Sequence, residues 1–499
     1  MEKIILPDQV NTIIHRLQSA GHEAYAVGGC VRDRLLGRTP GDWDITTSAR
    51  PLEVKSLFGH TVDTGIAHGT VTVLIDHKGF EVTTYRIDGE YEDARHPKQV
   101  EFTSQLSLDL SRRDFTINAM AYNDEAGIID LFGGIKDIEN RIVRCVGNPD
   151  SRFKEDALRI MRAVRFCAQL DFQIEPQTLL AIASHAGELS RISAERIRVE
   201  LTKLLLSDHP ERLLTAQETG LTAVFLPEFD RMLATAQENP HHIYNVGMHT
   251  IHALSYLAGL TTKAGTMAWA DKKPQGDDIP QQARNLFILS SLSPKEHTIL
   301  RYALLLHDCA KPLDKTIDPD GIAHFIGHDW DGAVLAEQIL RRLKFDNETI
   351  HVVSHLVKMH DMRYGESGKK VKERTVRRAL SRVGTTYFDL LTLLQEADLN
   401  AQNPALLPEK LNQLWQARQI ADKIRAKGQC ISLKELAVNG SDLICAGIKP
   451  GPQVGQRLNE LLDYVIEYPE KNNREDLLLY LGILLTEPSP KPSNTPQIL

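Results

Sequence analysis

The first 145 residues alternate between short apolar runs and turn residues, which predicts a region of mixed α and β structure. Residues 7–20 have helical periodicity, with one apolar face formed by Val10, Ile13, Ile14 and Leu17. The run AYAVGG then predicts a strand that ends in a glycine turn, and VRDRLLG predicts a helix that ends at Gly37. Further strands are expected at DWDITT, HGTVTVLID, FEVTTYRI and SRRDFTINAMAYN.

From Ser151 onward the pattern is almost entirely helical. The segments FKEDALRIMRAVRFCAQL and AERIRVELTKLLL each predict an amphipathic helix. A polar stretch at 261–280 predicts an insertion loop, and the Pro- and Ser-rich end EPSPKPSNTPQIL predicts a disordered tail. We therefore expect an α+β protein whose successive parts span residues 1–145, 146–235, 236–405, 406–486 and 487–499.

Composition narrows the class of protein but does not identify it. A chain of 499 residues is too long for one ordinary core, so several domains are expected. The net charge of −8 means that any nucleic-acid-binding face must be a local concentration of basic side chains. No stretch is apolar and long enough for a membrane span. The cysteines form no CxxC pair, which predicts reduced thiols in a cytoplasmic enzyme: Cys30, Cys145, Cys167, Cys309, Cys430 and Cys445.

Two aspartates, Asp42 and Asp44, flank Trp43 in the run GDWDITT. Alternate side chains of a strand project to the same face, so both carboxylates are expected to point one way. Such carboxylates repel each other unless a cation lies between them, and Mg²⁺ is commonly held by one or two carboxylates and substrate phosphates. Two such ions activate an attacking hydroxyl and stabilise a leaving pyrophosphate. Alone, the pattern also fits a pair of solvated turn aspartates.

A glycine turn in GGCVRD precedes this pair in the sequence. Gly28 and Gly29 allow the backbone to approach a phosphate closely, and the N-terminus of the helix that follows favours an anion. Arg32 lies in the first turn of that helix, within reach of a triphosphate. A glycine turn, an arginine and two aspartates on the next strand are together far more specific than any one of them.

These segments, with RRDFTINA, DLFGG and EDALRIMRAVRF, resemble the successive motifs of class II tRNA nucleotidyltransferases and bacterial poly(A) polymerases over about the first 230 residues. The resemblance implies a polymerase-beta-like catalytic head with a mixed sheet at 1–145 and a helical neck at 146–235. It also implies nucleotidyl transfer to tRNA from CTP and ATP with Mg²⁺.

The resemblance assigns roles to individual residues of the head. It implies that Asp42 and Asp44 bind the metal ions. A third carboxylate is usual on a neighbouring strand, and Glu81 of FEVTT fits it better than Asp114 does. The residues expected to bind the nucleotide are Gly28, Gly29, Arg32 and Arg113.

The helix predicted at FKEDALRIMRAVRF carries a second group of polar residues. Asp156 and Arg159 are three residues apart, hence neighbours on a helix surface, and Arg162 follows on a related face while Arg165 turns away. An aspartate that accepts from the exocyclic amine and an arginine that donates to the ring nitrogen would admit CTP and ATP and exclude UTP and GTP. The resemblance implies this base-reading role, and also counts Arg165 with the nucleotide-binding set. Solvated ion pairs on a helix are the alternative.

The segment DGEYEDARHPKQVEF resembles the flexible loop that full CCA-adding enzymes use when they switch from CTP to ATP, with ARHP where RRP is the commoner form. The region VKSLFGHTVDTGIAHGT does not carry the basic signature of poly(A) polymerases. We therefore expect CCA addition, with a poly(A) polymerase or an enzyme that adds only A as the alternative.

Histidines and aspartates recur through the helical half of the chain. ALLLHDCAKP places His307 beside Asp308 at the end of an apolar helix, with His249 upstream and Asp398 downstream. Imidazole and carboxylate ligands suit a transition metal that polarises a phosphate and activates water. Residues 236–405 resemble the HD phosphohydrolase superfamily, which implies that these four residues bind a metal such as Mn, Ni or Co.

His328 and His360 would then contact phosphate or bind a second metal, and His252, His355 and Asp361 are close competitors in the sequence. In relatives such a domain acts on cyclic phosphates and 2′-phosphates at RNA ends, so RNA-end repair is a further expectation. An HD phosphohydrolase with a regulatory nucleotide-binding head is the alternative from another class. Residues 406–486 resemble the helical tail that binds tRNA, with Lys449 as a candidate phosphate contact.

Overall fold

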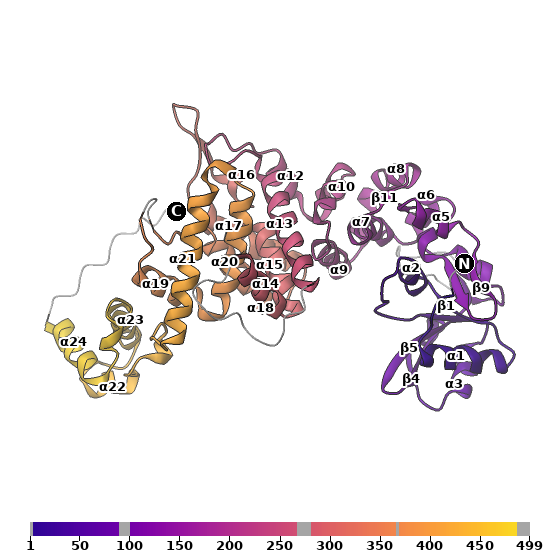
Figure 1. Ribbon diagram of the computed structural model, residues 1–499, viewed down its shortest axis with the longest axis horizontal. Helices are drawn as coiled ribbons and strands as arrows, with labels where there is room; N and C mark the ends of the chain where they lie inside the picture. Colours follow the sequence, from indigo (N-terminus) through magenta and orange to yellow (C-terminus); the bar gives the residue numbers. More distant parts are fainter. Residues whose placement is uncertain (1–2, 89–99, 267–280, 366–368, 487–499) are drawn as a thin grey trace. The chain divides into compact units, whose positions relative to one another are not determined.

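The protein was analysed as a computed structural model, which describes residues 3–88, 100–266, 281–365 and 369–486 (Figure 1). It divides into an N-terminal unit, Met1–Ala234 with Gln338–Asp346, and a C-terminal unit, Thr235–Glu337 with Asn347–Leu499. Most of the segment DGEYEDARHPKQVEF, much of the expected insertion loop and the expected disordered tail lie outside the described residues. None of the described helices is long and apolar enough to cross a membrane.

The N-terminal unit is built on a seven-stranded mixed sheet of order β3-β4-β5-β2-β1-β8-β9. Its strands are β1 Ala24–Val27, β2 Ile45–Thr47, β3 Thr61–Gly65, β4 Thr70–Ile75, β5 Lys78–Thr84, β8 Met120–Asn123 and β9 Gly127–Asp130. Within this sheet only β2 and β5 pair in parallel, with Ile45 opposite Val82. Short two-stranded pairings join β6 Arg86–Asp88 to β7 Val100–Phe102 and β10 Ile142–Val143 to β11 Gln173–Ile174.

Two helices pack against this sheet because each presents an apolar stripe to it. The four apolar residues expected on α1 Asp8–Ser19 are all buried, and α1 and α3 Pro51–Leu57 contact each other and the strands (Figure 1). Helix α2 Gly29–Leu35 follows β1 directly and contacts it. The predicted strand at RRDFTINAMAYN is shorter than expected, because residues 116–118 form a 3-10 turn before β8.

The rest of the N-terminal unit is helical. Its helices are α4 Leu106–Ser111, α5 Gly134–Glu139, α6 Pro149–Glu155, α7 Leu158–Leu170, α8 Pro176–Ser184, α9 Ala194–Leu205, α10 Leu213–Glu218, α11 Thr222–Phe225 and α12 Pro227–Leu233. The prediction of a single helix at FKEDALRIMRAVRF is wrong, since α6 ends at Glu155 and Asp156 adopts an extended conformation. The Asp156 side chain accepts a hydrogen bond from the Leu158 backbone N–H, which competes with continuation of the helix.

The C-terminal unit consists of helices and one small hairpin of β12 Lys315–Ile317 and β13 Ala323–Phe325. Its helices are α13 Val246–Thr266, α14 Gln281–Ser291, α15 Pro294–Leu306, α16 Lys311–Asp314, α17 His328–Arg342, α18 Asn347–Met359, α19 Glu373–Val383, α20 Thr385–Asn400, α21 Leu407–Ala426, α22 Gly440–Cys445, α23 Pro452–Glu467 and α24 Arg474–Thr486. Helices α13, α15 and α20 contact one another, and α18 contacts α15 and α20 (Figure 1). The last three helices enclose a separate small core that includes Leu443, Leu461 and Leu477.

Candidate functional site

Carboxylates gather where β2 begins beside the middle of β5. The predicted strand at DWDITT starts only at Ile45, so Asp42 and Asp44 lie in the segment just before it. The register of Ile45 opposite Val82 makes Asp44 and Glu81 neighbours, one residue earlier on each strand. Asp44 and Glu81 line one small cavity of about 170 Å³ together with Arg113.

The electrostatics of these carboxylates favour a bound cation. Partial removal from solvent and the charge of Asp42 raise the pKa of Asp44, although Arg113 opposes the shift. The pKa of Glu81 is raised in the same way, by desolvation and then by Asp44 and Asp42. Each carboxylate therefore destabilises the ionised form of its neighbours, and a divalent cation among them would relieve this repulsion. The donor set fits Mg²⁺, because all of its ligands are carboxylate oxygens.

Asp114, the alternative third carboxylate, already has a partner. It is 8% exposed, and it accepts from Arg162 Nε at 2.8 Å and from Asn118 Nδ2 at 3.1 Å. Burial alone would raise the pKa of this carboxyl, but Arg162 and Asn118 hold it well below its usual range. The geometry therefore favours Glu81 as the third metal ligand.

Asp114→Asn is expected to destabilise the N-terminal unit by roughly 3–5 kcal/mol at pH 7, because it leaves the Arg162 guanidinium without its buried counter-charge. The folded-state pKa of Asp114 is depressed, so its contribution is fully present above the unfolded pKa of about 3.9 and is lost as the pH falls through the folded value. Urea unfolding should show a constant gap between wild type and variant from pH 8 to pH 5.

The matched control for this variant is Asp63→Asn, which breaks the surface ion pair with Lys55 and should cost only about 0–1 kcal/mol. A gap for Asp114→Asn that narrows already between pH 7 and pH 5 would contradict the depressed pKa.

Two arginines lie close to the glycine turn. Gly28 has φ +82°, and a Cβ there would lie 2.8 Å from Arg113 Nη1, so only glycine fits without a shift. Gly29 is the first residue of α2, and Arg32 is 8% exposed, with its guanidinium held by Asn118 Oδ1 at 2.6 Å. Arg113 lies 3.6 Å from the buried Asp109 carboxylate. Arg113 is thus fixed beside Asp44 and Glu81, whereas the Arg32 guanidinium is held by Asn118 and by Asp33.

The expected base-reading residues surround the break between α6 and α7. Asp156 lies outside both helices, and its Oδ2 atom is 2.8 Å from Arg196 Nη2. Arg159 donates to Glu155 Oε2 at 2.6 Å and to the Arg112 carbonyl at 2.9 Å. The helix-surface adjacency predicted for Asp156 and Arg159 is therefore wrong in its geometry, although the two residues remain linked by a backbone hydrogen bond of 3.0 Å.

One aromatic ring, Phe166, links the arginines of the two groups. The guanidinium carbons of Arg32, Arg162 and Arg165 lie 5.0, 5.4 and 3.8 Å from its centroid. Arg165 also pairs with the buried Glu200 at 2.6 Å. Sequence reasoning did not single out Phe166, yet its position directly after Arg165 in RAVRF was a usable signal, because a ring can hold several guanidiniums by cation–π contact.

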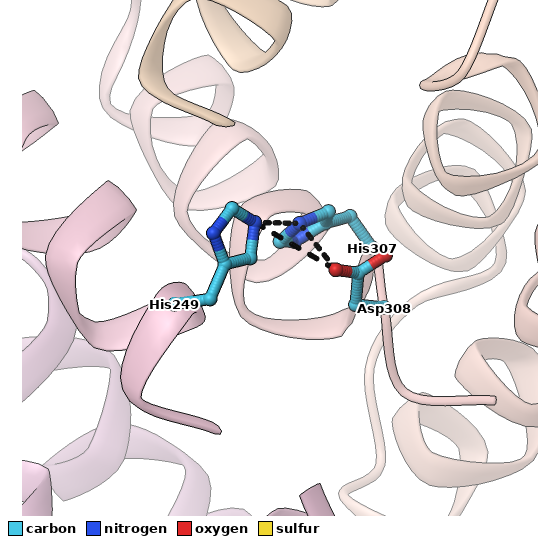
Figure 2. Close-up of side chains that lie close together, drawn as sticks. All are labelled: His249, His307 and Asp308. Atoms are coloured by element: carbon cyan, nitrogen blue, oxygen red, sulfur yellow. Dashed lines mark hydrogen bonds and ion pairs between the residues drawn. The ribbon is translucent and has the colours of Figure 1, made fainter. Parts of the chain in front are cut away.

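A second site lies in the C-terminal unit, where His249 of α13 faces His307 and Asp308 at the end of α15 (Figure 2). The His307 Nε2 atom is 3.3 Å from His249 Nε2 and 3.2 Å from Asp308 Oδ2. Asp398 of α20 completes the group, with Oδ1 2.9 Å from His249 Nε2. The structure therefore brings together the four residues expected to bind a metal.

A second group shares Asp308. His328 Nε2 lies 3.6 Å and His360 Nε2 3.5 Å from Asp308 Oδ1, and the two Nε2 atoms are 3.3 Å apart. The three ligand atoms at His249, His307 and Asp308, and the three at Asp308, His328 and His360, each lie close enough together to hold one metal ion.

The hydrogen bonds of these histidines fix which nitrogen faces the cluster. In each of the four rings, Nδ1 contacts a backbone carbonyl. The partners are Ala401 for His249, Leu304 for His307, Phe325 for His328 and Val357 for His360. A carbonyl only accepts, so each Nδ1 carries a proton, and Nε2 is the ring nitrogen that faces Asp308 and could bind a metal. The Asp308 carboxylate is buried at the centre of these Nε2 atoms. Imidazole nitrogens gathered around a buried carboxylate fit metal ions.

The competitors named from the sequence belong to neither group, although His355 and Asp361 line the cavity beside the cluster. His252 stacks on Tyr244 with ring centroids 4.1 Å apart, His355 stacks on His351, and Asp361 is exposed near Arg363. Lys311 was missed: its Nζ atom lies 2.8 Å from Asp308 Oδ2, and its place three residues after Asp308 was the available signal. The cluster opens into a cavity of about 1650 Å³.

Three family models match the chain. They are described as "Poly A polymerase head domain" over residues 24–144, "Probable RNA and SrmB- binding site of polymerase A" over residues 171–233, and tRNA nucleotidyltransferase domain 2 over residues 331–481. Together they cover parts of both units.

Curated relatives carry the name CCA-adding enzyme. The one from Limosilactobacillus fermentum is 34% identical over 478 residues, which is 95% of this chain and 96% of that enzyme. The one from Lactiplantibacillus plantarum is 55% identical over 215 residues, 43% of this chain and 53% of that enzyme. The match to several other relatives also spans only about half of their length, for example 49% of the enzyme from Limosilactobacillus reuteri.

Solved structures of the same fold cover nearly the whole chain. The CCA-adding enzyme of Bacillus stearothermophilus in complex with CTP is 28% identical, with a TM-score of 0.65 over 96% of this chain and 98% of that one. The CCA-adding enzyme of Thermotoga maritima in complex with tRNA is 20% identical, with a TM-score of 0.53 over 96% and 97% of the two chains.

Proposed function

This chain belongs to the family of the CCA-adding enzymes, and from that premise we propose that it adds C, C and A to the 3′ end of tRNA from CTP and ATP, without a nucleic-acid template. Nucleotidyltransferases of this kind use divalent metal ions, and the ion proposed here is Mg²⁺. As a tRNA-processing enzyme with free cysteines, it is assigned to the cytoplasm. The observation that carries the proposal is the group of Asp42, Asp44 and Glu81 beside Arg113.

The reaction follows from that group. The 3′ hydroxyl oxygen of tRNA attacks the α-phosphorus of CTP or ATP, the bond from that phosphorus to the bridging oxygen breaks, and pyrophosphate leaves. Divalent ions held by Asp42, Asp44 and Glu81 would activate the hydroxyl and stabilise the charge on the leaving group. Arg32 and Arg113 bind the triphosphate oxygens as fixed cations.

The parts of the chain take separate roles in this proposal. Residues 1–145 form the catalytic head, 146–235 the neck that selects the base, 236–405 the HD part and 406–486 the tail that binds tRNA. Incubation of the protein with tRNA that lacks its 3′ end, with each NTP alone and with all four, tests it. Sequenced ends that read CCA support the proposal, and ends that gain only A, or a run of A, support the A-adding alternatives.

Base selection is assigned to Asp156 and Arg159. Asp156→Ala should lower the preference for CTP over UTP by about one to two powers of ten, because the lost acceptor is worth roughly 1–3 kcal/mol of discrimination. Arg159→Ala should weaken the binding of CTP and of ATP to a similar extent, since both bases use the same ring-nitrogen contact. Single-nucleotide incorporation onto tRNA ending at the discriminator base measures the four ratios.

Asp156 also caps Leu158 and pairs with Arg196, so its removal has a structural cost of about 1 kcal/mol. A structural cost affects all four nucleotides alike, and the NTP ratios separate it from base reading. Asp150→Ala, which removes the partner of His185 on α6, is the control that should leave every ratio unchanged. Unchanged ratios in both site variants would assign base reading to other residues.

A second function is favoured by the histidine–aspartate cluster, in which four Nε2 atoms face Asp308. We propose that the C-terminal unit is a metal-dependent phosphohydrolase that removes 2′,3′-cyclic and 2′-phosphates from RNA ends. His249, His307, Asp308 and Asp398 would hold one transition metal ion, and His328 and His360 would hold a second through the shared Asp308. Phosphate release by the wild type with Mg²⁺, Mn²⁺, Ni²⁺ or Co²⁺ tests this function.

A further inference from the structure

The cavity beside the histidine–aspartate cluster is much larger than a phosphate needs. Its volume of about 1650 Å³ exceeds the roughly 300–1,000 Å³ of pockets that enclose drug-sized ligands. Asp308, His328, His360 and Asp398 line one part of it, and the lining continues to residues that no metal would contact. A substrate that fills the cavity therefore has a body well beyond the phosphate.

Trp330 lines this cavity from α17, two residues after His328. Its side chain is 62% exposed, and that of Ile326, which lines the same cavity, is 86% exposed. Tryptophan is well buried on average. An indole that stays exposed in the wall of a cavity, beside a cluster that fits metal ions, offers apolar surface to a ligand. The matching ligand surface is flat and apolar.

A cation lies against the same ring. Lys358 Nζ of α18 is 3.4 Å from the Trp330 ring centroid, a cation–π contact that holds the indole in place. Lys358 lines the cavity as well, as does Arg382 of α19. Proteins bind single-stranded nucleic acid with aromatic side chains on which the bases stack and basic side chains that hold the phosphates.

We propose that Trp330 stacks on the nucleobase of the nucleotide whose 2′- or 2′,3′-cyclic phosphate enters the histidine–aspartate cluster. The inference rests on the proposed phosphohydrolase function and names the substrates that the site prefers: nucleoside phosphates at an RNA end, over phosphomonoesters that carry no base. Ile326 extends the apolar platform, and Lys358 keeps the ring in position. Stacking tolerates all four bases, because every base has a π face.

Hydrolysis of two substrates by the full-length enzyme tests this role. Trp330→Ala should raise the KM for 2′-AMP about tenfold or more, as expected for the loss of one stacked base, and leave kcat/KM for glycerol 2-phosphate unchanged. Trp330→Phe should recover most of the loss because it keeps an aromatic face. The matched control is Val334→Ala, one turn later on α17: this side chain is 58% exposed but is not among the described residues that line the cavity.

The outcomes separate the two proposals. Equal losses on both substrates with Trp330→Ala, or no loss on either, would overturn stacking while leaving the phosphohydrolase intact. Absence of phosphate release from both substrates in the wild type would overturn the phosphohydrolase instead. In that case 2′-AMP should still quench the part of the tryptophan fluorescence that Trp330→Phe removes, and identical quenching in wild type and variant would overturn stacking as well.

Discussion

Asp44→Asn is expected to reduce incorporation of CTP into tRNA at least about a thousandfold. The asparagine keeps the size of the side chain but removes the charge that binds a divalent ion next to Glu81. Metal-ion stabilisation of the transition state is worth several kcal/mol, and each 1.4 kcal/mol or so is about tenfold in rate. Single-turnover incorporation onto tRNA ending at the discriminator base, at saturating CTP, measures the loss in the chemical step.

Two further variants make this result specific. Glu81→Gln should show a similar loss if Glu81 is the third ligand, whereas Asp114→Asn should act mainly on stability through Arg162. Asp63→Asn, on strand β3, removes a carboxylate that pairs only with Lys55 among the described residues and should retain full activity. Activity of Asp44→Asn within about threefold of the wild type would remove these carboxylates from the chemistry.

The strands and helices of the N-terminal unit were predictable because their signals are local. Alternating apolar residues and the turns at Gly28 and Gly37 are enough to indicate β1 and α2, and the apolar stripe of α1 is buried as expected. The break at Asp156 was not predictable from periodicity, since the apolar pattern continues through it. There one side-chain hydrogen bond to the Leu158 N–H outweighs the helical preference of the flanking residues.

The partners of charged residues were harder to predict from the sequence than the helices and strands were. Asp114 and Glu81 are both acidic residues near the strand motifs, so the sequence does not distinguish them. The fold does, because Asp114 forms an ion pair with Arg162, which is 48 residues away in the sequence. In the helical half, the spacing in the sequence makes His252 and His249 equally plausible as metal ligands. Packing decides between them, because one ring stacks on Tyr244 and the other faces His307.

Asp308→Asn is expected to abolish phosphate release from 2′-AMP, by about a thousandfold or more, while nucleotide addition persists. Asp308 lies within 3.7 Å of the Nε2 atoms of His249, His307, His328 and His360, so one substitution weakens both groups of ligands. The loss of a charged ligand at both ions would remove several kcal/mol of transition-state stabilisation. Phosphate release and CTP incorporation by the same preparation measure the two activities separately.

Metal binding gives a readout that does not depend on turnover. A metal at 100 times its dissociation constant stabilises the folded protein by about 2.7 kcal/mol. Mn²⁺, Ni²⁺ or Co²⁺ should therefore raise the unfolding temperature of the wild type more than that of Asp308→Asn, which keeps only the carboxylate site of the N-terminal unit. Asp318→Asn is the control, since it removes another histidine–aspartate pair, with His324, at the surface of the β12–β13 hairpin. The same metal-induced shift in Asp308→Asn and wild type would mean that these ions bind elsewhere, and the cluster would then be held together as a buried network of ion pairs around Lys311.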